Sequence, residues 1–140
     1  MDLPCGTAII KGAKRPPMTN IPLISIVDDD ESVRESVRGL LRSVRFGVEA
    51  FASAEEFLSS DRARETDCLI LDVRMSGMSG LELQSRLVAS HRVIPVVFIT
   101  AHGDEELRSR ALRGGAVDFL LKPFSEEALL NAVHTALGAK

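Results

Sequence analysis

Five short apolar runs alternate with five amphipathic stretches from residue 21 onward, and this alternation limits the possible folds more than any other feature of the chain. The expected strands are residues 23–27, 48–51, 68–72, 95–100 and 117–121. The expected helices are residues 33–44, 53–60, 81–90, 106–113 and 125–137. Strands that alternate with helices predict a parallel sheet covered on both faces. We therefore expect an α/β fold, a doubly wound five-stranded parallel sheet with five helices.

Helix signals support this pattern. One apolar stripe at helical spacing runs along the first expected helix and consists of Val33, Val37, Leu40, Leu41 and Val44. The segment Ser53-Ala-Glu-Glu56 fits a capping box, in which the serine oxygen accepts from a backbone N–H and the glutamate reaches back. Gly114-Gly115 and Gly138 are typical of helix ends.

The size and composition of the chain fit one globular domain. It has 140 residues, of which 45% are hydrophobic, and a formal net charge of -3. This mild negative charge argues against direct binding of nucleic acid, which normally requires a basic patch.

The longest apolar run, at residues 93–101, is too short to span a bilayer. Cys5 and Cys68 lie in unlike contexts, which favours reduced cysteines and a cytoplasmic location. We expect a flexible tail at residues 1–20 and a folded domain at residues 21–140.

Polar residues stand where the expected strands end. These residues are Asp28, Asp29 and Asp30 after the first strand, Asp72 at the end of the third, Thr100 at the end of the fourth and Lys122 after the fifth. Ligands of doubly wound sheets bind beyond the carboxyl ends of the strands, so these side chains are expected to converge. Two carboxylates 4 Å apart repel by about 4 kcal/mol at an effective dielectric near 20. Either the aspartates are solvated helix caps, or a positive group normally lies among them.

A divalent cation and a phosphoryl group together fit this set of side chains. Mg²⁺ prefers oxygen ligands and needs only one or two carboxylates, because it keeps several waters. The amine of Lys122 and the hydroxyl of Thr100 would then be left to hold an anion that the metal also binds. The convergence of several such groups on one edge favours this interpretation over isolated helix caps.

Four segments carry a resemblance to a known family: IVDDDESVRES, LDVRMSGMSG, VVFITAHGD and GGAVDFLLKPF. Together they resemble the receiver domain of two-component response regulators, and above all the receivers that precede LuxR-type output domains. The resemblance covers residues 21–138, with the motifs in the expected order and spacing. It implies a flavodoxin-like sheet with strand order 2-1-3-4-5.

The resemblance assigns roles to the acidic residues. Asp72 matches the phosphoacceptor, whose carboxylate takes a phosphoryl group from a phosphohistidine on a sensor histidine kinase. Asp28 and Asp29 match the acidic pair that holds magnesium, together with Asp72 and the backbone carbonyl of Arg74. Asp30 matches a position that is more solvated.

The resemblance also assigns the residues that respond to the phosphate. Thr100 matches the hydroxyl that turns toward the phosphate, and Lys122 matches the lysine that forms a salt bridge with it. Phe119 matches the aromatic switch residue, which rotates inward when the threonine moves. Ala101 is small, as access of the phosphate requires.

Two positions concern the loops around the site. Pro123 matches a proline that usually follows a cis peptide bond. Ser76 departs from the family pattern, since many members have proline there, and this change should loosen the loop without removing a ligand.

The resemblance implies a magnesium-dependent phosphoacceptor that is a signalling domain rather than an enzyme and catalyses only its own phosphorylation and dephosphorylation. Its expected partner is a sensor histidine kinase. Phosphorylation would change the face formed by the fourth helix, fifth strand and fifth helix, which would control a homodimer or an effector. We expect no membrane partner.

Two other classes of protein remain as alternatives. Aspartate-nucleophile hydrolases also place an aspartate at a strand end beside magnesium, but they typically have a second aspartate two residues later, where this chain has Arg74. A receiver-like interaction module that is never phosphorylated usually loses an acidic residue or the lysine, and this chain has both.

Overall fold

The computed structural model describes residues 21–101 and 103–138, and the tail expected at residues 1–20 lies outside the described residues. The strands are β1 (Leu23–Val27), β2 (Gly47–Phe51), β3 (Cys68–Asp72), β4 (Val96–Thr100) and β5 (Asp118–Leu121). The α-helices are α1 (Glu31–Ser43), α2 (Ala54–Ser59), α3 (Gly80–Ala89), α4 (Glu105–Arg113) and α5 (Glu126–Gly138). All strand pairs are parallel, in the order β2-β1-β3-β4-β5. The expected fold class and strand order are confirmed.

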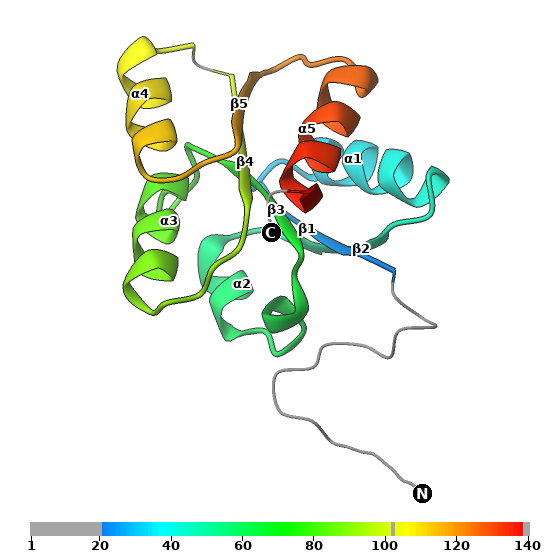
Figure 1. The fold of residues 1–140 in the computed structure, drawn as a ribbon, viewed down its shortest axis with the longest axis horizontal. Coiled ribbons are helices and arrows are strands. Elements are labelled where there is room, and N and C mark those ends of the chain that lie inside the picture. The colour runs from blue at the N-terminus through cyan, green and yellow to red at the C-terminus, as the bar shows by residue number, and fades with distance from the viewer. Residues whose placement is uncertain (1–20, 102, 139–140) are drawn as a thin grey trace, which may run out of the picture.

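Helices cover both faces of the sheet, as Figure 1 shows. One face packs against α1 and α5 through residues such as Ile26 and Ile70. The other packs against α2, α3 and α4, with Leu71 and Phe98 in that core. Successive side chains of a strand point to opposite faces, so a strand between two helical layers is buried along its whole length. Every residue of β1, β3 and β4 is buried.

Side-chain caps explain the small differences between the expected and observed helix starts. The helix α1 begins two residues earlier than expected, because Asp30 accepts a hydrogen bond from the N–H of Ser32. At α2, Ser53 accepts from the N–H of Glu56, but the Glu56 carboxylate accepts from the N–H of Ala52 and not from that of Ser53. The capping box predicted there is therefore only half formed.

Other local features were missed or only partly expected. Ser79 and Glu82 form a complete capping box at the start of α3. The short 3-10 helix η2 (Arg62–Glu65) was not predicted, because four residues are too few to show a period. Gly114 caps α4 as expected, and Gly138 is the last residue of α5.

Parallel pairing brings the carboxyl ends of the strands to one edge of the sheet, where Asp28 follows β1 and Asp72 ends β3. Thr100 is paired with Leu121, the residue before Lys122. The Lys122–Pro123 bond is cis, as the resemblance implied. Across the described ranges, no helix is both long enough and apolar enough to cross a membrane.

Candidate functional site

Three carboxylates meet at this edge of the sheet. Asp28, Asp29 and Asp72 each offer one oxygen, and these oxygens all lie within 4.8 Å of one another. Asp28 is completely buried and Asp72 is 5% exposed, whereas Asp29 is exposed. The cluster therefore combines two carboxylates that have lost most of their contact with water and one that remains solvated.

Lys122, from the segment after β5, lies among these carboxylates. Its Nζ atom is 2.8 Å from Oδ2 of Asp28 and 3.7 Å from Oδ2 of Asp72. Burial opposes the charge of the ammonium group. The hydrogen bond to Asp28 and the negative charges of Asp72 and Asp28 outweigh this effect, so the pKa of Lys122 is raised. Lys122 therefore stays protonated and offsets part of the negative charge.

The Asp72 carboxyl group is the most perturbed acid of the site. Burial is the largest cause, and the nearby charge of Asp28 adds to it. Together they raise the pKa of Asp72 to about 7, although Lys122 acts in the opposite direction. The single ammonium group of Lys122 thus does not fully compensate the negative charge of the three carboxylates. A further cation bound among them would favour the ionised form of Asp72.

Asp29 and Asp30 accept hydrogen bonds from residues outside the cluster. Asp30 is exposed and caps α1, and the hydroxyl of Ser32 donates to it and lowers its pKa. For Asp30, the helix-cap interpretation therefore applies. Asp29 accepts a hydrogen bond from the N–H of Ser76 at 3.3 Å. A proline at position 76 has no N–H and could not make this bond, so the departure from the family pattern adds a tie to the loop.

The other predicted residues lie at β4 and β5. Thr100 is fully buried, and its carbonyl accepts from the N–H of Lys122 at 2.8 Å. Ala101, the residue after β4, is exposed. The ring of Phe119 is 8% exposed and its centroid lies 6.5 Å from that of Phe98. Phe119 thus already points into the core, where burial of the ring is favourable. In this structure the ring therefore occupies the inward position that the resemblance assigns to the switched state.

The loop between β3 and α3 is held close to Asp72. The N–H of Val73 donates to the carbonyl of Ile99 at 3.1 Å, and the N–H of Gly80 donates to the carbonyl of Val73 at 2.9 Å. A Cβ atom on Gly80 would collide with the carbonyl oxygen of Asp72. The loop also contains Arg74, whose side chain is exposed. Glycine at position 80 thus lets α3 start directly against the end of β3.

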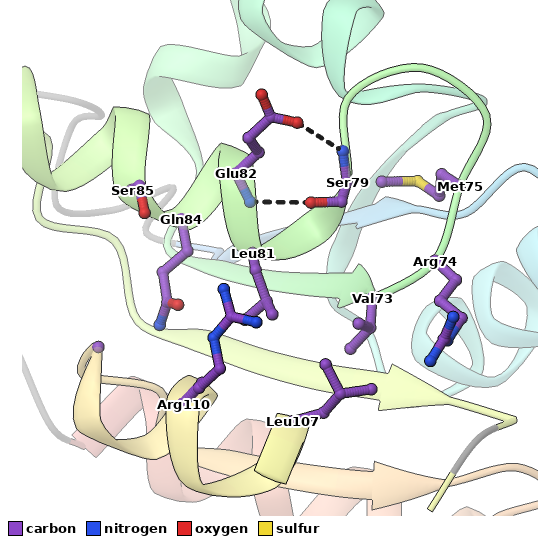
Figure 2. A pocket seen from close by; sticks show the side chains of 11 residues that line it. Val73, Arg74, Met75, Ser79, Leu81, Glu82, Gln84, Ser85, Leu107 and Arg110 are labelled. Atoms are coloured by element: carbon purple, nitrogen blue, oxygen red, sulfur yellow. Dashed lines mark hydrogen bonds between the residues drawn. The ribbon is translucent and has the colours of Figure 1, made fainter. Parts of the chain in front are cut away.

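A groove of about 600 Å³ lies between α3 and α4, next to this loop (Figure 2). Arg74 and Arg110 line it together with Leu107 and Gln84. Neither arginine has an ion-pair partner within the described part of the chain. The groove contains none of the three clustered carboxylates, so it adjoins the acidic site but is separate from it.

Sequence reasoning did not single out Glu55, which lies in the first turn of α2. Its carboxylate accepts a hydrogen bond from the N–H of Met78, in the loop after β3, at 3.0 Å. No local pattern announces this contact, because the two residues are 23 positions apart. By contrast, the capping box of α3 follows the S-x-x-E pattern, which identifies it from sequence alone.

The donor set fits a hard divalent cation such as Mg²⁺. All three clustered ligand groups are carboxylates, which suit magnesium, whereas zinc sites usually include histidine or cysteine. The raised pKa of Asp72 indicates uncompensated negative charge that a cation would relieve.

Comparison with protein families identifies one match. Residues 24–134 match the model of the response regulator receiver domain. Among curated proteins, the chain is 49% identical to nodulation protein W of Bradyrhizobium diazoefficiens over 114 residues, which is 81% of this chain and 50% of that protein. It is 47% identical to the response regulator protein TmoT of Ectopseudomonas mendocina, over 82% of this chain and 52% of that protein. The chain thus spans about half the length of the curated relatives it matches.

Solved structures show the same similarity. The response regulator StyR has 52% sequence identity and a TM-score of 0.78, over 85% of this chain and 60% of the StyR chain. The FixJ-N structure has 36% identity and a TM-score of 0.79, over 87% of this chain and 98% of that chain.

Proposed function

Because this chain belongs to the response regulator receiver domain family, we propose that Asp72 accepts a phosphoryl group from a sensor histidine kinase in a magnesium-dependent reaction. The observation that carries the proposal is the convergence of Asp28, Asp29, Asp72 and Lys122 at one edge of the sheet. This arrangement supplies a nucleophile, ligands for a cation and a fixed ammonium group within one small volume.

The reaction is a transfer between two nucleophiles. An oxygen of the Asp72 carboxylate forms a bond to phosphorus, and the bond between phosphorus and the kinase histidine nitrogen breaks, with its electron pair returning to the imidazole. Protein catalysis of phosphoryl transfer is mostly positioning and neutralisation of charge. The ammonium group of Lys122 lies 3.7 Å from Asp72, so it is placed to stabilise charge on the transferred group.

Other residues of this chain hold the cation and admit the phosphoryl group. Asp28, Asp29, Asp72 and the backbone carbonyl of Arg74 would hold Mg²⁺. When bound, the ion supplies positive charge that offsets the charges of the carboxylates and the phosphoryl oxygens. The hydroxyl of Thr100 donates to the new phosphate, and the small side chain of Ala101 leaves the approach open.

The output of the domain is a change in the face formed by α4, β5 and α5. A phosphate adds charge and acceptor oxygens next to Thr100, which favours one packing of these elements over another. Because Phe119 is already buried, phosphorylation shifts a population between packings and does not create the inward position of this ring. The face then controls a homodimer or an effector.

The boundaries and the setting of the domain belong to the same proposal. The proposed receiver domain extends over residues 21–140, and the chain spans about half the length of the relatives it matches. The domain itself does not bind nucleic acid. The proposed location is the cytoplasm, which the free and buried Cys68 supports.

Labelled acetyl phosphate separates this function from its two alternatives. The wild-type protein with Mg²⁺ should acquire one phosphoryl group, and Asp72→Asn should acquire none. Absence of label from both proteins would favour the phosphorylation-independent interaction module. Rapid multiple turnover on small phosphate esters would favour the hydrolase, although Arg74 stands where that class typically has its second aspartate.

A further inference from the structure

The loop from Val73 to Ser79 is anchored at both ends by the backbone bonds of Val73 and Gly80 described above. Between these ends, residues 74–78 form no backbone–backbone hydrogen bonds with any other described residue. The backbone of Arg74 hydrogen-bonds to the carboxylate of Asp72, and Met75 and Met78 pack against the core. Side chains therefore hold the central part of the loop, which includes the carbonyl of Arg74.

Two carboxylates from other elements hold this central part. Asp29 accepts from the N–H of Ser76 at 3.3 Å, and Glu55 accepts from the N–H of Met78 at 3.0 Å. Asp29 is itself an expected magnesium ligand, so its carboxylate would serve both the loop and the cation. Glu55 is not one of the clustered carboxylates. Its bond to the Met78 N–H therefore holds the loop without taking part in the carboxylate cluster.

Gly77 shows how closely Glu55 fits the loop. Its φ angle is +79°, a left-handed conformation that glycine adopts without strain. A Cβ atom at this position would also lie 3.0 Å from Oε2 of Glu55, tighter than ordinary contacts. The positive φ favours glycine at position 77, and the absence of a Cβ there leaves room for the Glu55 carboxylate.

We propose that Glu55 is a positioning residue for the magnesium site, which holds the loop after Asp72 so that the carbonyl of Arg74 faces the carboxylate cluster. The inference rests on the proposed function, because it assumes that this cluster binds Mg²⁺. A hydrogen bond to an ionised acceptor is about twice as strong as one between neutral groups.

The chain offers a close control in Glu56. Both glutamates lie in the first turn of α2, both are exposed, and both accept one backbone N–H, but Glu56 bonds to Ala52 and not to the loop. Glu55→Ala and Glu56→Ala therefore remove the same charge from the same helix end. Glu55→Gln keeps an oxygen acceptor and removes the charge.

Two measurements on the full chain test whether Glu55 positions the loop. Two-dimensional NMR spectra first establish that each variant is folded. Hydrogen exchange of the Met78 amide is followed in the metal-free protein, and the Kd for Mg²⁺ is measured by calorimetry. Glu55→Ala should accelerate exchange at Met78 and weaken magnesium binding by about tenfold, as loss of supporting contacts commonly does. Glu56→Ala should leave both quantities within about twofold of wild type, and Glu55→Gln should restore most of the affinity.

Three results would overturn the inference. Unchanged exchange at Met78 in Glu55→Ala would show that the bond does not hold the loop. Equal weakening by Glu55→Ala and Glu56→Ala, or no recovery in Glu55→Gln, would assign the effect to charge alone. Failure of the proposed function has a different signature, namely a wild-type protein that takes up no magnesium at millimolar concentration or accepts no phosphoryl group on Asp72.

Discussion

At the scale of single residues, the site is a balance between three carboxylates and one ammonium group. Asp28 and Asp72 are buried, and Lys122 lies close to both. The contact from Lys122 to Asp28 is shorter than that to Asp72. Burial, and then the charge of Asp28, raises the pKa of Asp72 despite Lys122. In the metal-free protein this charge distribution costs stability, because a buried carboxylate must ionise near a second one.

The pH dependence of stability follows from Asp72. Its pKa rises from 3.8 to about 7 on folding, so the folded state keeps a proton that the unfolded chain releases between these values. The contribution of Asp72 to the free energy of unfolding therefore falls as pH rises from about 4 to about 7.

The first prediction is that Asp72→Asn removes this penalty. In EDTA at pH 8, the variant should be more stable than wild type by about 1–3 kcal/mol, and the gain should vanish near pH 4. Urea unfolding at a series of pH values measures it. A gain that is independent of pH would contradict the assigned protonation.

The second prediction concerns Lys122. Replacing Lys122 with Met should destabilise the metal-free protein by about 1–3 kcal/mol at pH 8, because Asp28 and Asp72 lose their positive neighbour. A double-mutant cycle with Asp28→Asn measures the pairwise part of this effect. A coupling free energy near zero would show that the 2.8 Å contact contributes nothing.

Most residues of the acidic site could be predicted from sequence, because parallel strands necessarily end at the same edge. The position of Glu55 could not, because it depends on how α2 packs beside the loop after β3. Nor could sequence give the buried orientation of Phe119, which is a choice between rotamers within one core.

At the scale of elements, the junction between β3 and α3 is the tightest part of the site. Gly80 begins α3 directly against the carbonyl of Asp72. Any side chain there must push the helix away from the strand that carries Asp72.

The third prediction follows from this junction. Gly80→Ala should destabilise the protein by about 2–3 kcal/mol, since backbone atoms cannot yield as a flexible side chain does. Gly39→Ala is the control, because a Cβ there meets no atom within 4 Å. Alanine in the middle of α1 should stabilise the protein by about 0.5–1 kcal/mol. Urea unfolding of both variants measures the difference, and equal effects would contradict the close packing at Gly80.

Strands and helices were predicted well, because each has a clear apolar period and a buried face. Their ends were predicted less well, because caps fix them. The early start of α1 depends on Asp30, which sequence reasoning had considered both as a helix cap and as part of the acidic site. The half-formed capping box at α2 depends on the rotamer of Glu56.

At the scale of the whole molecule, the sheet connects Asp72 on β3 to β5 through β4. Asp72 ends β3, and β4 lies between β3 and β5 in the sheet. The helices α4 and α5 precede and follow β5 in the chain. A phosphate on Asp72 is therefore expected to act through Thr100 on the face of α4, β5 and α5.

The fourth prediction tests this transmission. Beryllofluoride with Mg²⁺, a mimic of the phosphate, should shift the amide resonances of residues 100–125 in the wild-type protein more than those of β2 and η2. Asp72→Asn provides the control and should show no such shifts. Spectra that change equally throughout the molecule, or not at all in residues 100–125, would contradict a switch at this face.

Trapping the phosphorylated residue tests the central claim most directly. Borohydride reduces an aspartyl phosphate to homoserine, so peptide mass spectrometry after treatment with a phosphoryl donor and Mg²⁺ locates the acceptor. Homoserine should appear at position 72 alone, and EDTA should abolish it. Homoserine at Asp28, Asp29 or Asp30, or none at any position, would contradict the account.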